Sequence, residues 1–328
     1  MKPRAVGRIP KAVIFSTLGV AAIAAASSLV AGWMLVRPRK RRDYDCVPRV
    51  PHGKLEALSL RTSDGLRLHA WVLLSRFASP DRWVLLLHGY RSDRAAVHLR
   101  TRFFSRRGYN VLLLHFRGHG SSDPSKISYG FHERRDVRAA FDFIRSLTPG
   151  RPAHTGIDGV SMGAAAAAYA VGHGEIEPDW MILESCYDNI RNALANRLAL
   201  RVGETLTPWV APPIGYVVEH LVHLRAEDLD PGKALQNCRC PVLVLAGDSE
   251  RVLRLVEIEY LFGCIPEPKR LVLFPEADHQ DLLSFDPRRY ARAVVSFLRE
   301  YVPLQVPARP GHSEIESAGP KIANRGHF

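Results

Sequence analysis

The stretch Gly159-Val160-Ser161-Met162-Gly163 decides the interpretation of this chain, because its serine lies between two glycines at the spacing of a sharp strand-to-helix turn. Such a turn strains the serine backbone, and a Cβ at either glycine would collide with the returning chain. A strand-like run with Thr155 and Ile157 precedes the stretch, and the small residues 164–168 begin a helical pattern after it. We therefore expect Ser161 to be a presented nucleophile rather than an ordinary serine of a glycine-rich loop.

Apolar runs alternate with helical patterns on both sides of this turn. Residues 55–61 and 66–74 alternate apolar and polar side chains around Ser63-Asp64-Gly65, which indicates a hairpin. Continuous apolar runs, as expected of strands buried on both faces, occur at 83–87, 111–114, 180–183, 242–246 and 271–274. Amphipathic helical patterns separate several of these runs. The sequence therefore predicts an α/β fold with a mostly parallel, doubly wound sheet.

The composition divides the chain into segments of different character. We predict a membrane anchor with basic flanks at 1–42, a linker at 43–54 and a catalytic domain at 55–302, followed by a disordered tail at 303–328 that is rich in Pro, Gly, Ser and charge. Within the domain, residues from about 187 to 237 are helical in pattern but interrupted by prolines. Because this segment falls between two strands whose carboxyl ends border the pocket, we interpret it as a short helical cap rather than a packed connector.

The amino-terminal segment predicts a single-pass anchor. Ala12–Val36 holds 25 residues without a charge or proline, more than the roughly 20 residues that a bilayer crossing needs. The alternative is a signal peptide cleaved after Ala24-Ala25-Ala26, but the apolar run continues for ten more residues. The basic flanks are nearly balanced and do not decide which side of the membrane the domain faces.

The net charge of +12 does not indicate nucleic-acid binding. Residues 1–42 hold nine Lys or Arg and no acid, whereas the other 36 basic residues face 33 acidic ones. The positive charge therefore belongs to the flanks of the predicted anchor, and we exclude nucleic acid as a partner. Five cysteines with Cys238-Arg239-Cys240 suggest neither a secreted disulfide framework nor a zinc site, which favours the cytoplasmic side. Nothing in the sequence indicates the oligomeric state.

Candidates for a catalytic triad follow in the chain order serine, acid, histidine. A serine hydroxyl needs an imidazole to accept its proton, and the imidazole needs a carboxylate to orient it. His279 follows the predicted strand at 271–274, where a loop borders the pocket. The acid is expected after the strand at 242–246, where Asp248 and Glu250 are both candidates. The backbone N–H groups of Met162 and Tyr90 are candidate donors for an oxyanion.

These motifs together resemble the α/β-hydrolase superfamily, in the branch of capped serine hydrolases that includes monoacylglycerol-lipase-like and serine-aminopeptidase-like proteins. The resemblance covers about residues 55–301 and rests on His88-Gly89-Tyr90, Arg117-Gly118-His119-Gly120-Ser121-Ser122, Gly130 with Glu133 and Asp136, Gly159–Gly163, Gly247–Glu250 and Asp278-His279. It implies a triad of Ser161, His279 and Glu250, an oxyanion hole at Tyr90 and Met162, and neither a cofactor nor a metal.

Two positions depart from the pattern of that branch. The acid position, three residues after Gly247, holds Glu250 where the branch usually has aspartate, so Asp248 remains the alternative. Asp158, directly before the serine turn, stands where an apolar residue is usual, and a buried carboxylate there needs hydrogen-bond partners. Neither departure removes a catalytic group.

The sequence thus predicts a membrane-anchored serine hydrolase that cleaves a carboxylic ester through an acyl-enzyme, with a lipophilic small-molecule acyl substrate. An amide or thioester is a further possible substrate of the same chemistry. The alternatives are a peptidase or amidase of the same fold, and a non-catalytic membrane-tethered binding protein. A lost serine, histidine or acid would indicate the binding protein, and none is lost.

The predicted anchor can be tested by fractionation. If Ala12–Val36 is an uncleaved span, the full-length chain sediments with membranes and resists extraction by carbonate, because the apolar segment cannot leave the bilayer. A mature amino terminus near Ser27, read by mass spectrometry, would instead establish a cleaved signal peptide.

Overall fold

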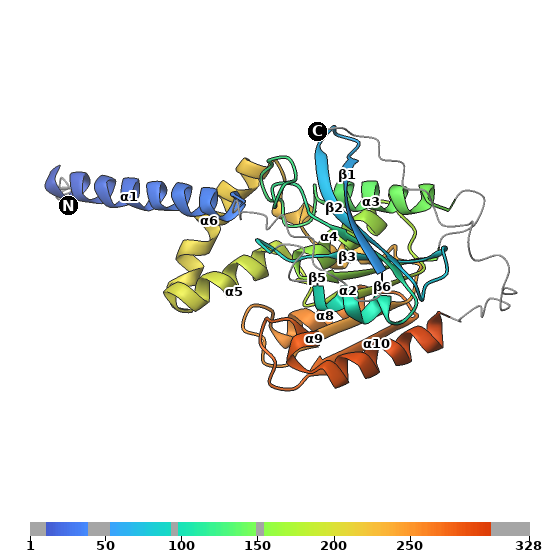
Figure 1. The fold of residues 1–328 in the computed structure, drawn as a ribbon. Helices are drawn as coiled ribbons and strands as arrows, with labels where there is room; N and C mark the ends of the chain where they lie inside the picture. The colour runs from blue at the N-terminus through green and yellow to red at the C-terminus, as the bar shows by residue number, and fades with distance from the viewer. Residues whose placement is uncertain (1–10, 39–52, 93–97, 149–153, 303–328) are drawn as a thin grey trace, which may run out of the picture.

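The computed structural model describes residues 11–38, 53–92, 98–148 and 154–302, which form an eight-stranded sheet with helices on both faces (Figure 1). The predicted tail at 303–328 and nearly all of the predicted linker at 43–54 lie outside these residues. The prediction of an α/β fold with a mostly parallel sheet is confirmed by the strand pairing.

The strands follow the apolar runs of the sequence, and their order across the sheet is β1-β2-β4-β3-β5-β6-β7-β8. The predicted hairpin forms the antiparallel pair β1–β2, and β2 also runs antiparallel to β4. All pairs from β4 to β8 are parallel. The strands are β1 (Gly53–Arg61), β2 (Arg67–Ser75), β3 (Arg82–Leu87), β4 (Asn110–Leu114), β5 (His154–Val160), β6 (Trp180–Glu184), β7 (Val242–Gly247) and β8 (Lys269–Phe274).

Each buried strand contributes to two cores, because successive side chains point to opposite faces of a sheet. In β3, Leu85 and Leu87 pack in the core with α3, α4 and α8, whereas Val84 and Leu86 pack in the core with α2, α9 and α10. The helices on the two faces are α3 (Arg134–Ser146), α4 (Met162–Gly172) and α8 (Leu255–Cys264), and α2 (His98–Ser105), α9 (Leu282–Phe285) and α10 (Pro287–Tyr301). The carboxyl ends of the parallel strands are left to carry the loops of a site.

The segment predicted as a cap holds helices and no sheet strand between β6 and β7. These elements are α5 (Ile190–Val202), α6 (Thr207–Val222), η2 (Ala226–Asp228) and α7 (Pro231–Leu235). Helices α5 and α6 extend beyond the sheet on the same side as the first helix, α1 (Lys11–Val36) (Figure 1).

The last turn of α1 is built into the fold beside the cap. At Gly32 the two helices α1 and α6 approach so closely that an added Cβ would lie 2.5 Å from Cγ1 of Val217. Val36 is 1% exposed, and its carbonyl accepts a hydrogen bond from the N–H of Ile127 at 2.8 Å. The carbonyl of Leu35 accepts one from the hydroxyl of Tyr90 at 2.6 Å. The carboxyl-terminal end of α1 therefore packs against the rest of the described fold.

The predicted transmembrane helix finds no support among the residues that the structure describes. None of their helices combines the length and the hydropathy that a membrane crossing requires. The side chains of residues 11–18 and 20, within the predicted span, lie outside the described set.

A buried ion network lies on the α2 side of the sheet. Arg100 of α2 is fully buried and contacts three carboxylates: Asp158 at 3.2 Å, Glu184 at 2.7 Å and Asp281 at 2.8 Å. The hydroxyl of Tyr290 donates to Asp158 at 2.8 Å. Asp158 therefore has the partners that its position requires. Burial raises the pKa of Asp158, and burial raises the pKa of Glu184 to about 7.

Arg100 is expected to contribute strongly to the stability of the fold. Arg100→Met leaves buried carboxylates without their cation, and we expect it to lower the free energy of unfolding by about 3–5 kcal/mol. The matched control is Arg138→Met, which breaks the exposed pair with Asp142 on α3 and is expected to change that free energy by less than about 1 kcal/mol. Urea unfolding measures both. Equal effects of the two variants would show that the buried network adds little to stability.

Candidate active site

Ser161 lies on a strained turn between β5 and α4. Its backbone adopts φ 52° and ψ −114°, a conformation that residues other than glycine rarely take. A Cβ on Gly159 would lie 2.7 Å from the N of Ala164, and one on Gly163 would lie 2.6 Å from the carbonyl oxygen of Leu87. The steric role predicted for both glycines is confirmed. The turn is closed by the N–H of Ser161, which donates to the carbonyl of Glu184 at 2.7 Å.

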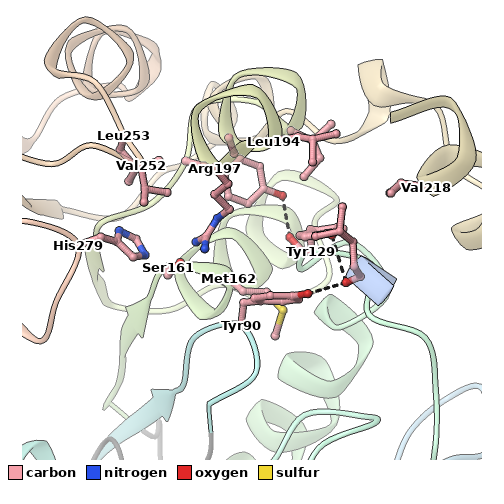
Figure 2. A pocket seen from close by; sticks show the side chains of 14 residues that line it. Tyr90, Tyr129, Ser161, Met162, Leu194, Arg197, Val218, Val252, Leu253 and His279 are labelled. Carbon is pink, nitrogen blue, oxygen red and sulfur yellow. Dashed lines mark hydrogen bonds between the residues drawn. The ribbon is translucent and has the colours of Figure 1, made fainter. Parts of the chain in front are cut away.

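The structure brings His279 and Glu250 together beside Ser161. Nδ1 of His279 donates to Oε2 of Glu250 at 2.9 Å, and Ser161 and His279 line the same pocket (Figure 2). Because the carboxylate binds the proton on Nδ1, Nε2 of the imidazole is left as the acceptor. A serine proton can be accepted only at that second nitrogen.

The carboxylate of Glu250 is fully engaged. Its Oε1 accepts a hydrogen bond from the N–H of Gly247 at 3.1 Å and another from the hydroxyl of Ser185. The side chain of Glu250 is completely buried, so these bonds hold the longer glutamate arm in one orientation toward His279. The loops of the acid and the base also pack directly on each other, because a Cβ on Gly247 would lie 2.1 Å from the carbonyl oxygen of Ala277.

The structure places Asp248, the alternative acid, away from the imidazole. Its Oδ1 accepts hydrogen bonds from the N–H of Glu276 at 2.8 Å and from the hydroxyl of Ser249 at 2.9 Å. Asp248 is exposed, and among the described residues its bonds hold the turn after β8 rather than the histidine ring. The geometry therefore favours Glu250 as the partner of His279.

The two predicted oxyanion donors come from loops that meet at Ser161. Met162 is the first residue of α4, where helix geometry leaves a backbone N–H without a partner inside the helix. Tyr90 follows Gly89, and a Cβ on Gly89 would lie only 3.5 Å from Cβ of Ser161. The loop after β3 thus passes close to the nucleophile. The arrangement suits two N–H groups that converge on a developing oxyanion.

A mostly apolar pocket extends from Ser161 under the cap (Figure 2). Leu35 from α1 forms part of its wall, and the ring of Tyr90 stacks on Tyr129 with centroids 5.6 Å apart. Both tyrosine hydroxyls donate to the carbonyl of Leu35, so their polar ends are paired with the backbone of α1. The remaining apolar lining comes from Met162, Tyr187, Ile190, Ala193, Leu194, Val218, Val252 and Leu253. Such a wall suits an alkyl chain.

Arg197 is a pocket residue that the sequence analysis did not identify. It lines the apolar pocket and also an adjoining, more polar opening that Ser161 and His279 line as well. Its position in the sequence contains the signal, because Ile190, Ala193, Leu194 and Arg197 recur at the spacing of one helix face. Periodicity would have placed this arginine on the buried face of α5.

The other motif residues hold the loops around the site. Arg117 contacts Asp136 at 2.6 Å and Asp64 at 2.7 Å, and so links the loop after β4 to α3 and to the β1–β2 turn. Glu133 accepts from the N–H groups of Ser128 and Gly130. These residues position backbone and do not enter the pocket. Within the described part of the chain, no group of three or more His, Cys, Asp or Glu side chains could hold a metal ion.

The sheet order, the strained serine turn and the acid–histidine pair after β7 and β8 define an α/β-hydrolase fold with a serine-hydrolase arrangement of side chains. A solved esterase of Pyrococcus furiosus, Pf2001, has this fold with a TM-score of 0.64, at 21% identity over 81% of this chain and 99% of that one.

The sequence comparisons agree with this fold. The family model "Serine aminopeptidase, S33" matches residues 78–231. The uncharacterized protein YfhR of Salmonella typhi is 23% identical over 75% of this chain and 82% of its own length. An uncharacterized protein of Mycobacterium tuberculosis is 27% identical over 74% of this chain and 78% of its own length. The family match and the structural likeness both agree with an α/β-hydrolase fold.

The choice of acid can be decided by paired substitutions. Glu250→Gln removes the negative charge that faces the imidazolium, and we expect kcat for ester hydrolysis to fall by roughly 10²–10⁴-fold. Asp248→Asn weakens only an exposed turn, and we expect a change of less than about tenfold. Steady-state kinetics on both variants, with circular dichroism to confirm folding, measures the difference. The reverse order of effects would assign the role to Asp248.

Proposed function

We propose that this protein is a serine esterase that cleaves a carboxylic ester through an acyl-enzyme intermediate. The observation that carries the proposal is the hydrogen bond between His279 and the buried Glu250, next to a serine on a strained turn. A serine without a catalytic role requires neither a strained backbone nor a neighbouring histidine that is hydrogen-bonded to a buried carboxylate. Together they supply the nucleophile, the base and the charge that stabilises the base when it is protonated.

The reaction proceeds in two halves on these groups. Oγ of Ser161 attacks the ester carbonyl carbon while Nε2 of His279 accepts the hydroxyl proton. The carbonyl oxygen becomes an oxyanion held by the N–H groups of Tyr90 and Met162. The intermediate collapses, and the alcohol leaves with the proton from His279. Water then attacks the acyl-enzyme in the same way, which releases the carboxylic acid and regenerates Ser161.

The pocket favours an ester with a lipophilic acyl group over a peptide. An aminopeptidase must bind the ammonium group of its substrate, which calls for a carboxylate near the nucleophile. The described residues that line the apolar pocket include no Asp or Glu, and their only formal charge is the cation of Arg197. Asp281 lines the adjoining opening, but it is paired with Arg100 at 2.8 Å. A positive charge repels an amino terminus. The apolar lining under α5 and α6 instead suits an alkyl chain.

We further propose that the amino-terminal helix tethers the enzyme to a membrane. The support comes from the uncharged run Ala12–Val36 with its basic flanks. In the described part of α1, several large apolar side chains are also about half exposed or more: Ile23, Leu29, Val30, Trp33 and Met34. Such side chains are unusual on a surface that faces water alone. A tether would hold the active site close to lipophilic esters.

The esterase proposal is tested by removing the nucleophile. Ser161→Ala is expected to abolish both hydrolysis of 4-nitrophenyl esters and covalent labelling by a fluorophosphonate, because no other group can form the acyl-enzyme. The control is Ser146→Ala, which removes an exposed hydroxyl on α3 and leaves both activities intact. Esters of graded acyl length measure the preference of the pocket. Turnover by Ser161→Ala at a comparable rate would refute the mechanism, and a wild-type protein that neither reacts with the probe nor hydrolyses esters would favour a binding protein.

A further inference from the structure

Arg197 occupies the boundary between two differently lined spaces around the nucleophile. On one side lies the apolar pocket under the cap. Adjoining it is a more polar opening, whose lining includes Ser92, Ser185 and Gln280. Ser161, His279 and Arg197 line both spaces. Figure 2 shows the guanidinium of Arg197 pointing from α5 toward Ser161 and His279.

The charge of Arg197 is not neutralised by an ion pair within the described residues. Arg100 contacts three carboxylates and Arg117 contacts two. Among the described residues, the side chain of Arg197 has neither an ion pair nor a hydrogen bond. Its one cation–π contact is with the ring of Tyr90, 5.9 Å from the centroid. Burial lowers the pKa of Arg197, which reflects the cost of holding a cation in this setting.

The carboxylates near Arg197 are already bound to other groups. Glu250 attracts the guanidinium, but its oxygens are bonded to His279, Ser185 and Gly247. Asp281 lines the polar opening, but it is paired with Arg100 at 2.8 Å and accepts a hydrogen bond from the N–H of Ser284 at 2.7 Å. A cation held beside the nucleophile without a dedicated partner is a site for an anion supplied by the substrate.

We propose that Arg197 recognises an anionic group on the alcohol part of the ester, so that the preferred substrates are acyl esters of an alcohol that carries a phosphate or carboxylate. This inference rests on the proposed esterase function and deepens it. The acyl chain fills the apolar pocket, whose described lining includes no Lys or Arg other than Arg197. The alcohol then lies in the polar opening, with its anion against the guanidinium. Arginine forms paired hydrogen bonds with phosphate or carboxylate oxygens, so either anion fits the same chemistry.

The experiment compares two esters that differ only in charge, 1-decanoyl glycerol and 1-decanoyl glycerol 3-phosphate, both below the concentration at which they form micelles. The full-length wild-type enzyme is expected to have the higher kcat/KM on the phosphate ester. Arg197→Met is expected to lower the ratio of kcat/KM for the phosphate ester to kcat/KM for the neutral ester by about 10- to 100-fold, mainly through a higher KM for the phosphate ester. This fold-change corresponds to the usual strength of a hydrogen bond to a charged group. Arg197→Lys should retain part of the preference, because it keeps the charge and loses the paired geometry.

A matched control separates contact from general attraction. Arg201→Met removes an exposed cation one turn further along α5, and it should leave the ratio unchanged. If Arg201→Met lowers the ratio as much as Arg197→Met, long-range attraction rather than recognition is responsible, and the proposal is wrong.

A second pair of substrates tests which end of the ester carries the anion. The mono-4-nitrophenyl ester of decanedioic acid and 4-nitrophenyl decanoate differ only by a carboxylate at the far end of the acyl chain. We expect the neutral ester to be preferred, because the apolar pocket excludes a charge. A preference for the acidic ester that depends on Arg197 would overturn the assignment to the alcohol side.

If the wild-type enzyme has the same kcat/KM on 1-decanoyl glycerol and on 1-decanoyl glycerol 3-phosphate, the recognition proposal fails while the esterase proposal stands. If no ester is cleaved, the esterase proposal itself fails.

Discussion

A single buried guanidinium connects the segments that carry the candidate catalytic groups. Arg100 contacts Asp158, which precedes the serine turn, and Asp281, which follows the histidine by two residues. It also binds the side chain of Glu184, whose backbone carbonyl accepts the N–H of Ser161. The strained turn and the histidine loop are thereby both tied to Arg100 of α2, on one face of the sheet. Because a buried charge tolerates little displacement from its partners, the relative positions of Ser161 and His279 depend on this interaction.

Much of this architecture could be predicted because local sequence patterns determine it. The glycines at 159 and 163 indicate the turn, since a residue with a Cβ does not fit at either position. The apolar runs indicate buried strands. Helix α2 was not predicted. Its eight residues include His98, Arg100 and Arg102, so its sequence is polar, and its burial depends on carboxylates that are distant in the chain. Asp158 indicated that a partner was needed, but the sequence does not identify which arginine supplies it.

The candidate site shows the same division between local and distant information. The order of serine, acid and histidine could be read from loops that follow strands, and the structure brings Ser161, Glu250 and His279 together. The position three residues after Gly247 already favoured Glu250 over Asp248, but the hydrogen bond from Ser185 that holds the glutamate comes from a distant loop, which no local pattern reveals. The role of α1 was also hidden, because an apolar helix has the same composition whether it faces lipid or protein. Its contact with α6 depends on the fit of Gly32 against Val217.

The junction between α1 and the pocket has a practical consequence for work with the isolated catalytic domain. A soluble fragment that begins after Val36 lacks Leu35, a wall of the acyl pocket, and also the carbonyl that accepts the hydroxyls of Tyr90 and Tyr129. Those two phenols would then lose a shared hydrogen-bond acceptor, and one of them belongs to Tyr90, the residue proposed to supply an oxyanion donor. Chain-length preferences measured on such a fragment would describe a pocket with one side removed. The first helix is thus part of the pocket wall, through Leu35, and not an appendage that can be removed without changing it.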